Sequence, residues 1–408
     1  MLSRLTDPPP PWVGGVSDAH PLALCGSSMH SSLATVKPTE EEQKQQRSVL
    51  QGFRQNKVPL SASNFGLYLS QISVAPSLLF ETFKMKFDNK TLDTEMDFIV
   101  ATDKEFGEVI AMSKGIYGGL DYLPSRYHSW LKDANRMVIL ARKDGKVIAL
   151  ESVCIIDDGE TMLVEGLRVA PSERGKGVAG ILQKYCIQLV KEKYPNVKII
   201  RLTRDDKLGP KDFRKYRLIT KQGILLVRFN VKELRSRMDD IVHMLEEAGS
   251  ELCPTVILER EEVKNIILSM TVSNKLLPSK TIIQDWQPFK PIESNLNLLL
   301  KKDLHWIVDN KQCPNFASLC TFPFRIPIGD DWFYLNIDMF GKDLAHIKSH
   351  LIAHLHNHTQ NGHGNIMCQI FMEPSLWEDM AYFCKHVICV EIAKGYTEQY
   401  LLESDLHP

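Results

Sequence analysis

The sequence predicts an α/β (α+β) protein with a central mixed sheet flanked by helices, followed by a second, degenerate copy of the same fold. Three observations predict this class. Apolar runs of strand length are separated by Asp-Gly turns, a strand leads into a glycine-rich turn at the head of a helix, and a β-α-β-α order occurs twice. The repetition is one of element order and not of residue identity.

The chain is too long for one ordinary domain. It has 408 residues, and its apolar fraction of 44% and charged fraction of 24% are typical of globular proteins. Residues 1–92 mix Pro, Ser and Gln with no sustained period, which is typical of a flexible segment. We therefore expect a flexible N-terminal extension over 1–92, a first folded domain over 93–232, a connecting helix over 233–250 and the degenerate copy over 251–408.

The first folded domain begins where the apolar pattern sharpens. Asp97 to Ala101 predicts a strand, and Asp103 to Ser113 predicts a helix that Asp103 can cap. Met137 to Arg142 and Val147 to Ile156 predict two antiparallel strands, because the Asp-Gly pair between them is typical of a hairpin turn. The remaining expected elements are a strand at 161–169, a helix at about 177–193, a strand at 198–203, a helix at 210–221 and a strand at 224–230.

The second copy is less clearly marked at its start. Its later part predicts a strand at Trp332 to Phe340, a helix at Lys342 to His356, a strand at Asn365 to Met372 and a helix at Ser375 to Val387. This order repeats that of residues 161–221, so we expect the same fold twice.

Charge and composition exclude several classes of partner. The chain has 49 Lys plus Arg against 50 Asp plus Glu, which removes the electrostatic case for a nucleic-acid or membrane-surface protein. The best apolar stretch, Val58 to Phe83, is interrupted by Ser, Asn, Gln and Pro, and the first residues lack a signal-peptide pattern. Nine scattered cysteines include no Cys-x-x-Cys pair. We expect a cytoplasmic protein with reduced cysteines.

The turn between residues 169 and 180 predicts an anion site. The strand ends at Val169, and Arg174-Gly175-Lys176-Gly177-Val178-Ala179 opens the next helix. The first N–H groups of a helix lack partners and the helix dipole adds positive potential, so a diphosphate can lie against backbone that has no side chains. The turn lacks the Gly-Lys-Ser/Thr ending of a nucleotide triphosphatase loop and the three-glycine spacing of a dinucleotide fold.

This arrangement resembles the GNAT superfamily of acetyltransferases. Its motif Arg/Gln-x-x-Gly-x-Gly/Ala matches Arg174, Gly177 and Ala179, and the flanking element order over 97–230 matches as well. The resemblance implies acetyl-CoA as co-substrate. Because this turn occurs in the first copy and not near Gly341 of the second, we expect catalysis in the domain at 93–232. The residues expected to hold the donor are Leu167, Val169, Arg174, Gly175, Lys176, Gly177, Val178 and Ala179.

Two segments show a narrower resemblance. Residues 113–124 and 165–169 are similar to the histidine N-acetyltransferase family of vertebrates, including its tandem layout. This implies transfer of acetyl to the α-amine of L-histidine, giving N-α-acetylhistidine and CoA. Another free amino acid, an amine or a peptide N-terminus remains an alternative acceptor, and a non-catalytic acyl-CoA-binding protein is an alternative of another class.

The reaction needs a neutral amine, whereas an α-amine with a pKa of roughly 8 is mostly protonated at pH 7. Glu165 is the candidate base, because it shares a strand face with Leu163 and Leu167. The alternative is a structural pairing of Glu165 with Arg168 or Arg201.

The acid that protonates the leaving thiolate is harder to identify. The family often places a Tyr four residues before a Gly-Phe pair, but here Gly223-Ile224 stands at that pair and Ile219 at the Tyr position. Tyr216 lies one turn earlier on the expected helix and is our candidate, with a packing role as the alternative.

The resemblance also places the loop from Tyr117 to Tyr127 across the pantetheine arm of the donor from the strand at 161–169. Within it Asp121, Tyr122 and Tyr127 are candidates to contact the imidazole, Arg126 is a candidate to contact the carboxylate, and Tyr117 is a further candidate substrate residue. For each of them loop packing is the alternative.

Six of thirteen histidines fall between His346 and His363. His346, His350 and His354 have a spacing that permits metal ligation, but no nearby carboxylate or cysteine completes a ligand set, so we expect a solvated face and no metal. The turn at 338–343 carries acids and only Gly341, so the second copy is expected to bind no acetyl-CoA and to support the first domain or wall the acceptor pocket.

Overall fold

A computed structural model describes residues 96–205, 208–247 and 252–406. The predicted extension at 1–92 and the apolar stretch Val58 to Phe83 lie outside these residues. Within the described part, no helix has the length and apolar character needed to cross a membrane.

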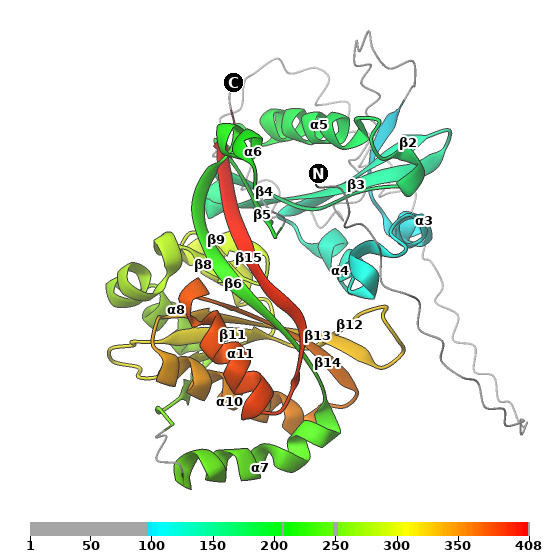
Figure 1. Cartoon of the computed structure of the whole chain (residues 1–408). Coiled ribbons are helices and arrows are strands. Elements are labelled where there is room, and N and C mark those ends of the chain that lie inside the picture. The colour runs from blue at the N-terminus through cyan, green and yellow to red at the C-terminus, as the bar shows by residue number, and fades with distance from the viewer. Residues whose placement is uncertain (1–95, 206–207, 248–251, 407–408) are drawn as a thin grey trace, which may run out of the picture. The chain divides into compact units, whose positions relative to one another are not determined.

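One sheet of thirteen strands runs through the described chain (Figure 1). Its strands are β1 (Asp97–Val100), β2 (Arg136–Lys143), β3 (Lys146–Ile156), β4 (Thr161–Val169), β5 (Ile199–Arg204), β6 (Arg217–Asn230), β7 (Val256–Ile257), β10 (Leu304–Val308), β11 (Ala317–Thr321), β12 (Phe324–Arg325), β13 (Trp332–Phe340), β14 (Asn365–Met372) and β15 (Glu391–Asp405). The order across the sheet is β1-β2-β3-β4-β5-β15-β6-β14-β13-β11-β10-β7, with β12 beside β13.

A small hairpin, nine α-helices and several short helical turns are the other elements of the described residues. The hairpin is β8 (Ile282–Gln284) and β9 (Gln287–Phe289). The helices are α3 (Phe106–Met112), α4 (Leu123–Lys132), α5 (Val178–Lys193), α6 (Pro210–Lys215), α7 (Val231–Glu247), α8 (Arg260–Ile267), α9 (Glu293–Leu299), α10 (Leu344–Asn361) and α11 (Trp377–His386).

The N-terminal part of the sheet is covered on both faces. Along β2, Met137, Ile139 and Ala141 pack with α5, whereas Val138 and Leu140 pack with α3 and α4 on the opposite face. Successive side chains of a strand point to opposite faces of the sheet. A strand that is covered on both faces therefore has apolar residues at consecutive positions. The predicted β2–β3 hairpin is confirmed, with Asp144 and Gly145 both at positive φ, as a tight hairpin turn requires.

Strand β15 lies between β5 and β6, so the last strand of the chain completes the sheet begun by the first domain. Arg201 of β5 is buried and bonds Glu403 of β15 at 2.8 Å. The predicted helix at 210–221 is wrong beyond Lys215, because β6 begins at Arg217 and pairs with β15 there. A strand partner nearly 190 residues away along the sequence, as in Arg217↔Glu403, overrides the local helical pattern.

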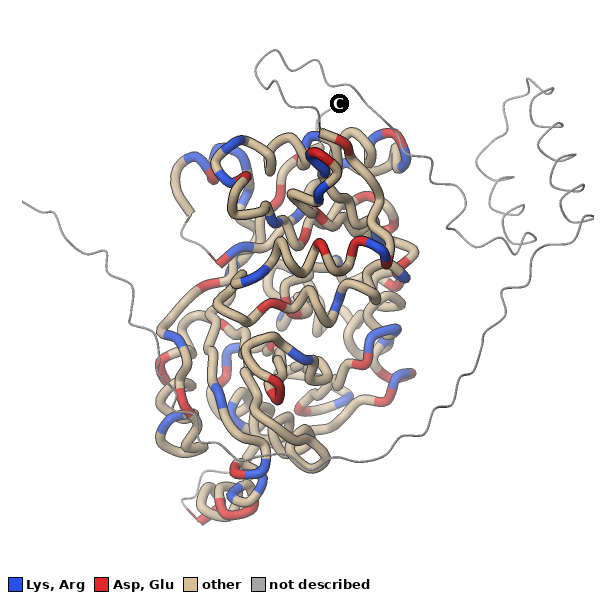
Figure 2. Tube along the Cα trace, turned by 90° about the vertical axis from the view of Figure 1, so that its right-hand side faces the viewer, with Lys and Arg blue, Asp and Glu red and all other residues tan. Residues whose placement is uncertain are grey.

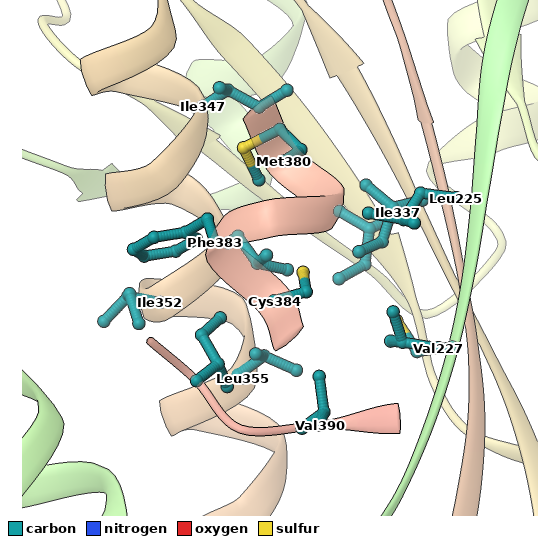
Figure 3. Packing of buried hydrophobic residues seen from close by; sticks show 14 of the residues in the cluster. Leu225, Val227, Ile337, Ile347, Ile352, Leu355, Met380, Phe383, Cys384 and Val390 are labelled. Atoms are coloured by element: carbon teal, nitrogen blue, oxygen red, sulfur yellow. The ribbon is translucent and has the colours of Figure 1, made fainter. Parts of the chain in front are cut away.

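The predicted strand-helix-strand-helix order near the C-terminus is confirmed as β13, α10, β14 and α11. Helices α10 and α11 pack on β6 and β13 through an apolar cluster that includes Ile347, Phe383, Cys384, Val227 and Ile337 (Figure 3). Burying each large apolar side chain contributes about 1.5–3 kcal/mol, so this cluster stabilises the whole C-terminal part.

Candidate active site

Strand β4 contains a bulge that opens the sheet. Leu150 pairs with Arg168 and Ser152 with Glu165, so Gly166 and Leu167 together oppose a single β3 residue. Gly166 has φ +67°, and a Cβ there would lie 2.9 Å from Trp130, so only glycine fits.

Beyond the bulge β4 and β5 diverge. The two strands pair only over Thr161–Leu163, and β5 continues along β15 instead. From Val164 to Val169, the edge of β4 that faces β5 has no strand partner among the described residues. Val169 O accepts from Arg174 Nε, while the other backbone N–H and C=O groups of this edge have no strand partner and can pair with an extended ligand.

The glycine turn lies at the end of this open edge. Gly175 and Gly177 have φ +76° and +80°, and residues 174–177 are exposed. Ile181 N donates to Gly177 O at 3.2 Å, and the N–H groups before Ile181 at the start of α5 are available to an anion. Arg174 Nε donates to Val169 O at 3.1 Å, which holds its guanidinium at the strand end.

Outside the glycine turn, the charged side chains of both signs are dispersed over the described chain. Figure 2 shows Lys and Arg interspersed with Asp and Glu along the whole described trace. An anion is therefore attracted by the local turn rather than by a basic face of the molecule.

Glu165 lies at the bulge and is held from both sides. Its Oε2 accepts from Arg136 Nη1 at 2.5 Å and its Oε1 from Gln287 Nε2 at 2.7 Å. Arg136 also donates to Ser152 Oγ at 2.7 Å and stacks on Trp130. Neither Arg168 nor Arg201, the partners considered from the sequence, holds it: Arg168 bonds Asp121, and Arg201 bonds Glu403.

The β8–β9 hairpin brings the C-terminal part of the chain to Glu165. Gln287 connects Glu165 to Lys302, because its amide oxygen accepts a hydrogen bond from Lys302 Nζ. Lys302 also donates to Gln284 Oε1 at 2.6 Å. Burial lowers the pKa of Lys302 to about 8, although the charge of Glu165 opposes this shift. The result is a continuous polar chain from Arg136 to Lys302.

The hairpin turn at Asp285 and Trp286 is fixed by several strands. Asp285 N donates to Asp338 Oδ2 of β13 at 2.8 Å, and Asp285 O accepts from Gln399 of β15 at 2.8 Å. Trp286 O accepts from Thr203 of β5 at 2.8 Å. Three strands therefore hold the turn in one position, which suits a side chain that contacts a ligand.

The carboxyl group of Asp285 is not committed to a structural bond. No described side chain forms a hydrogen bond with it, and burial raises its pKa to about 6. Arg126, Lys302 and Glu165 all act on it electrostatically. Arg126 stacks on Phe324 at 4.3 Å and forms no ion pair with any described carboxylate. Acidic and basic groups from the N-terminal and C-terminal parts of the described chain thus lie close together.

The remaining loop candidates divide into two groups. Tyr117 is 58% exposed and stacks on Tyr122, whose hydroxyl lies beside Gly166, so both stay candidates. Asp121 is buried and bonds Arg168 at 2.9 Å, and Tyr127 is fully buried with its hydroxyl on Thr102 O at 2.7 Å. The expectation that Asp121 and Tyr127 contact an acceptor conflicts with this burial, because both side chains fill the loop interior.

Tyr216 is not on a helix. It follows α6 with extended backbone, φ −127° and ψ 146°, and Lys215 Nζ lies 4.7 Å from its ring. The helical spacing that suggested it is therefore wrong, while its role as an acid stays a prediction.

The corresponding strands of the second copy do not diverge. β13 and β14 pair in parallel from Trp332 to Asp338, seven positions against three for β4 and β5. Asp338, at the end of this pairing, is buried, and burial raises its pKa well above the ordinary value. A Cβ on Gly341 would lie 2.3 Å from Phe316, so this glycine serves packing.

The histidine face is not solvated, contrary to expectation. His350 and His354 are fully buried, because α10 packs onto the sheet with this face. The premise that no cysteine lies nearby is also wrong, since Cys320 of β11 lies close to His354 and His358 in space.

Sequence reasoning missed Arg136, Asp285, Gln287 and Lys302. Arg136 stands at the start of β2 and pairs with Cys154 of β3, whereas Glu165 pairs with Ser152, so the contact between Arg136 and Glu165 crosses β3 and does not follow from the strand register. The other three come from residues 251–331, where no periodic pattern marked the elements. They contact Glu165 or lie near it only because of the tertiary fold, and no local sequence pattern predicts this.

Family models match both parts of the chain. The acetyltransferase (GNAT) family matches residues 94–209, and the C-terminal region of histidine N-acetyltransferase matches 251–373. A histidine N-acetyltransferase of Scomber australasicus is 58% identical over 316 residues, which cover 76% of this chain and 94% of that protein. A human protein described as probable N-acetyltransferase 16 is 56% identical over 317 residues, 76% of this chain and 86% of that one.

Among solved structures, a tandem GNAT protein from the clavulanic acid biosynthesis pathway aligns with a TM-score of 0.47 and 12% identity, over 77% of this chain and 99% of that one. The identity of 58% to the first of these relatives, over 94% of its length, decides the family. The chain belongs to the histidine N-acetyltransferase family of GNAT acetyltransferases.

Proposed function

We propose that the chain transfers the acetyl group of acetyl-CoA to the α-amine of L-histidine, giving N-α-acetylhistidine and CoA. The observation that supports the proposal is the open edge of β4, with the exposed turn of Gly175 and Gly177 at one end and a set of opposite charges beside Glu165 at the other. The relative from Scomber australasicus is named for this activity.

The donor binds along the open edge. The diphosphate lies on the N–H groups of the turn at 174–179, and the pantetheine arm pairs with the free backbone groups near Leu167 and Val169. A backbone N–H of the same edge stabilises the oxyanion that forms when the amine attacks the thioester carbonyl.

The acceptor lies between β4 and the β8–β9 hairpin. A free amino acid carries a carboxylate and an ammonium group, and Arg126 offers a cation for the first. Glu165, fixed by Arg136 and Gln287, and Asp285 offer anions for the ammonium and for a basic side chain. A peptide N-terminus lacks the free carboxylate that Arg126 would bind.

Asp285 is the proton acceptor in this proposal. Both oxygens of Glu165 already accept hydrogen bonds, whereas the Asp285 carboxylate is uncommitted and its pKa of about 6 leaves it ionised at neutral pH. Asp285 removes a proton from the ammonium and releases it to solvent. The neutral nitrogen then forms a bond to the acetyl carbon and loses its second proton to Asp285, and the C–S bond breaks. The thiolate of CoA, with a thiol pKa near 8.5, leaves and takes a proton from Tyr216 or solvent.

Release of free thiol from acetyl-CoA tests the proposal directly. The purified chain is assayed with histidine, other free amino acids, histamine, polyamines and short peptides. Histidine is expected to have the highest kcat/KM, with N-α-acetylhistidine as the product identified by mass spectrometry. A higher value for another acceptor would overturn the choice of histidine, and no thiol release with any acceptor would favour an acyl-CoA-binding protein.

A further inference from the structure

A cysteine and two histidines converge beneath α10. Cys320 lies on β11, and His354 and His358 are one helical turn apart on the face of α10 that covers this strand. One ring nitrogen of each histidine and the Cys320 sulfur all lie within 4.8 Å of one another. Cys320 and His354 are fully buried.

The histidines leave ring nitrogens unused. His354 Nε2 lies 2.8 Å from Ser318 Oγ, but His354 Nδ1 is buried and finds no hydrogen-bond partner among the described residues. His358 Nε2 is likewise buried and has no hydrogen-bond partner among the described residues. A buried polar atom without a partner destabilises the folded state, so two of them beside one thiol call for an explanation.

The surroundings hold the ligands in place. Ser318 Oγ lies 2.8 Å from His350 Nδ1 as well as from His354, which fixes the orientation of the His354 ring. His305 stands opposite Cys320 in the β10–β11 pair and stacks on His358 at 5.1 Å, while its Nδ1 accepts from Asn357 at 2.6 Å. His305 therefore flanks the group.

We propose that Cys320, His354 and His358 bind one divalent transition-metal ion of the zinc type. A thiolate and two neutral imidazoles are ligands that zinc prefers, at roughly 2.3 Å for sulfur and 2.0–2.1 Å for nitrogen. Since no carboxylate belongs to the group, magnesium and calcium are excluded. Three protein ligands leave a fourth position for water, and the ion ties α10 to β11 in the part of the chain that carries the hairpin.

Cobalt titration of the full chain tests this site. The protein is freed of metal with a chelator and titrated with Co²⁺ alone. One equivalent is expected to bind and to give visible d–d bands together with a thiolate-to-cobalt charge-transfer band in the near ultraviolet. Zn²⁺ should displace the cobalt and bleach both bands, and it should raise the melting temperature of the metal-free protein.

Two variants locate the ligands. Cys320→Ala should abolish the charge-transfer band, and His358→Gln should weaken Co²⁺ binding at least about tenfold. Cys384→Ala is the matched control, because Cys384 is an equally buried thiol among apolar side chains and should leave the spectrum unchanged (Figure 3). If a ligand variant fails to fold, the wild-type titration still decides.

Two results would overturn the site: a wild-type protein that gives no cobalt spectrum, or a charge-transfer band that survives in folded Cys320→Ala. Because the readout is metal binding, neither result depends on acetyl transfer.

Discussion

Two carboxylates stand beside the acceptor position, and their hydrogen bonding separates their roles. Glu165 is held by Arg136 and Gln287, whereas Asp285 has an uncommitted carboxylate on a turn fixed by three strands. A fixed anion orients a substrate ammonium, and a free carboxylate of raised pKa accepts its proton.

Asp285→Asn is therefore expected to lower kcat/KM for histidine about 100-fold. Burial raises the pKa of Asp285 to about 6, so the ionised base is lost as the pH falls through 6, and log kcat/KM should bend downward there in the wild type but not in Asp285→Asn. Glu165→Gln should instead raise KM and keep this bend. An unchanged pH profile in Asp285→Asn would assign the base to Glu165.

Arg126 is the residue that distinguishes a free amino acid from a plain amine. Its guanidinium has no described carboxylate partner and stacks on Phe324. Arg126→Gln should lower kcat/KM for histidine about 10- to 100-fold, since a hydrogen bond to a charged group contributes about 1.5–3 kcal/mol. Histamine, which lacks the carboxylate, should be acetylated equally by both proteins.

Arg325→Gln is the matched control for Arg126, because Arg325 also stacks on an aromatic ring but is exposed and bonds Asp330 O. This variant should leave both acceptors unaffected. Equal losses for histidine and histamine in Arg126→Gln would show that Arg126 serves packing and not carboxylate recognition.

At the scale of elements, the bulge in β4 creates the open edge. Gly166→Ala should lower the free energy of unfolding by about 2–4 kcal/mol, because the Cβ meets Trp130 at 2.9 Å and φ +67° strains any other residue. Gly159→Ala is the control, since Gly159 also has positive φ but has space around it. Urea denaturation measures both. Equal losses in the two variants would mean that the contact with Trp130 contributes nothing.

Elements with a strong local signal were predictable from the sequence. The Asp144-Gly145 hairpin and the strands at Trp332–Phe340 and Asn365–Met372 have clear patterns and turns, and all three are confirmed. The end of α6 was not predictable, because β6 is extended by its pairing with β15.

The candidate site divides in the same way. The turn at 174–179 has a local signature of glycines and bases, so the sequence predicts it. The acceptor side depends on the β8–β9 hairpin meeting β4, a contact between residues 122 positions apart in Gln287 and Glu165. No local sequence pattern predicts a contact between residues so far apart in the chain.

At the scale of the molecule, one sheet joins both copies of the fold, but their central strand pairs differ. β4 and β5 diverge after Leu163, whereas β13 and β14 remain paired to Asp338. We therefore propose one donor site, in the N-terminal copy, while the C-terminal copy supplies Asp285, Gln287 and Lys302 to the acceptor side.

Calorimetric titration with acetyl-CoA tests this assignment most directly. The wild type should bind one equivalent per chain. Gly175→Asp should weaken binding at least about tenfold, because it places a negative charge among the N–H groups meant for the diphosphate, at a position with open space for the side chain. Lys342→Asp, the matched change in the corresponding turn of the second copy, should bind as the wild type does. Two equivalents per chain, or Gly175→Asp binding as tightly as Lys342→Asp, would contradict the account.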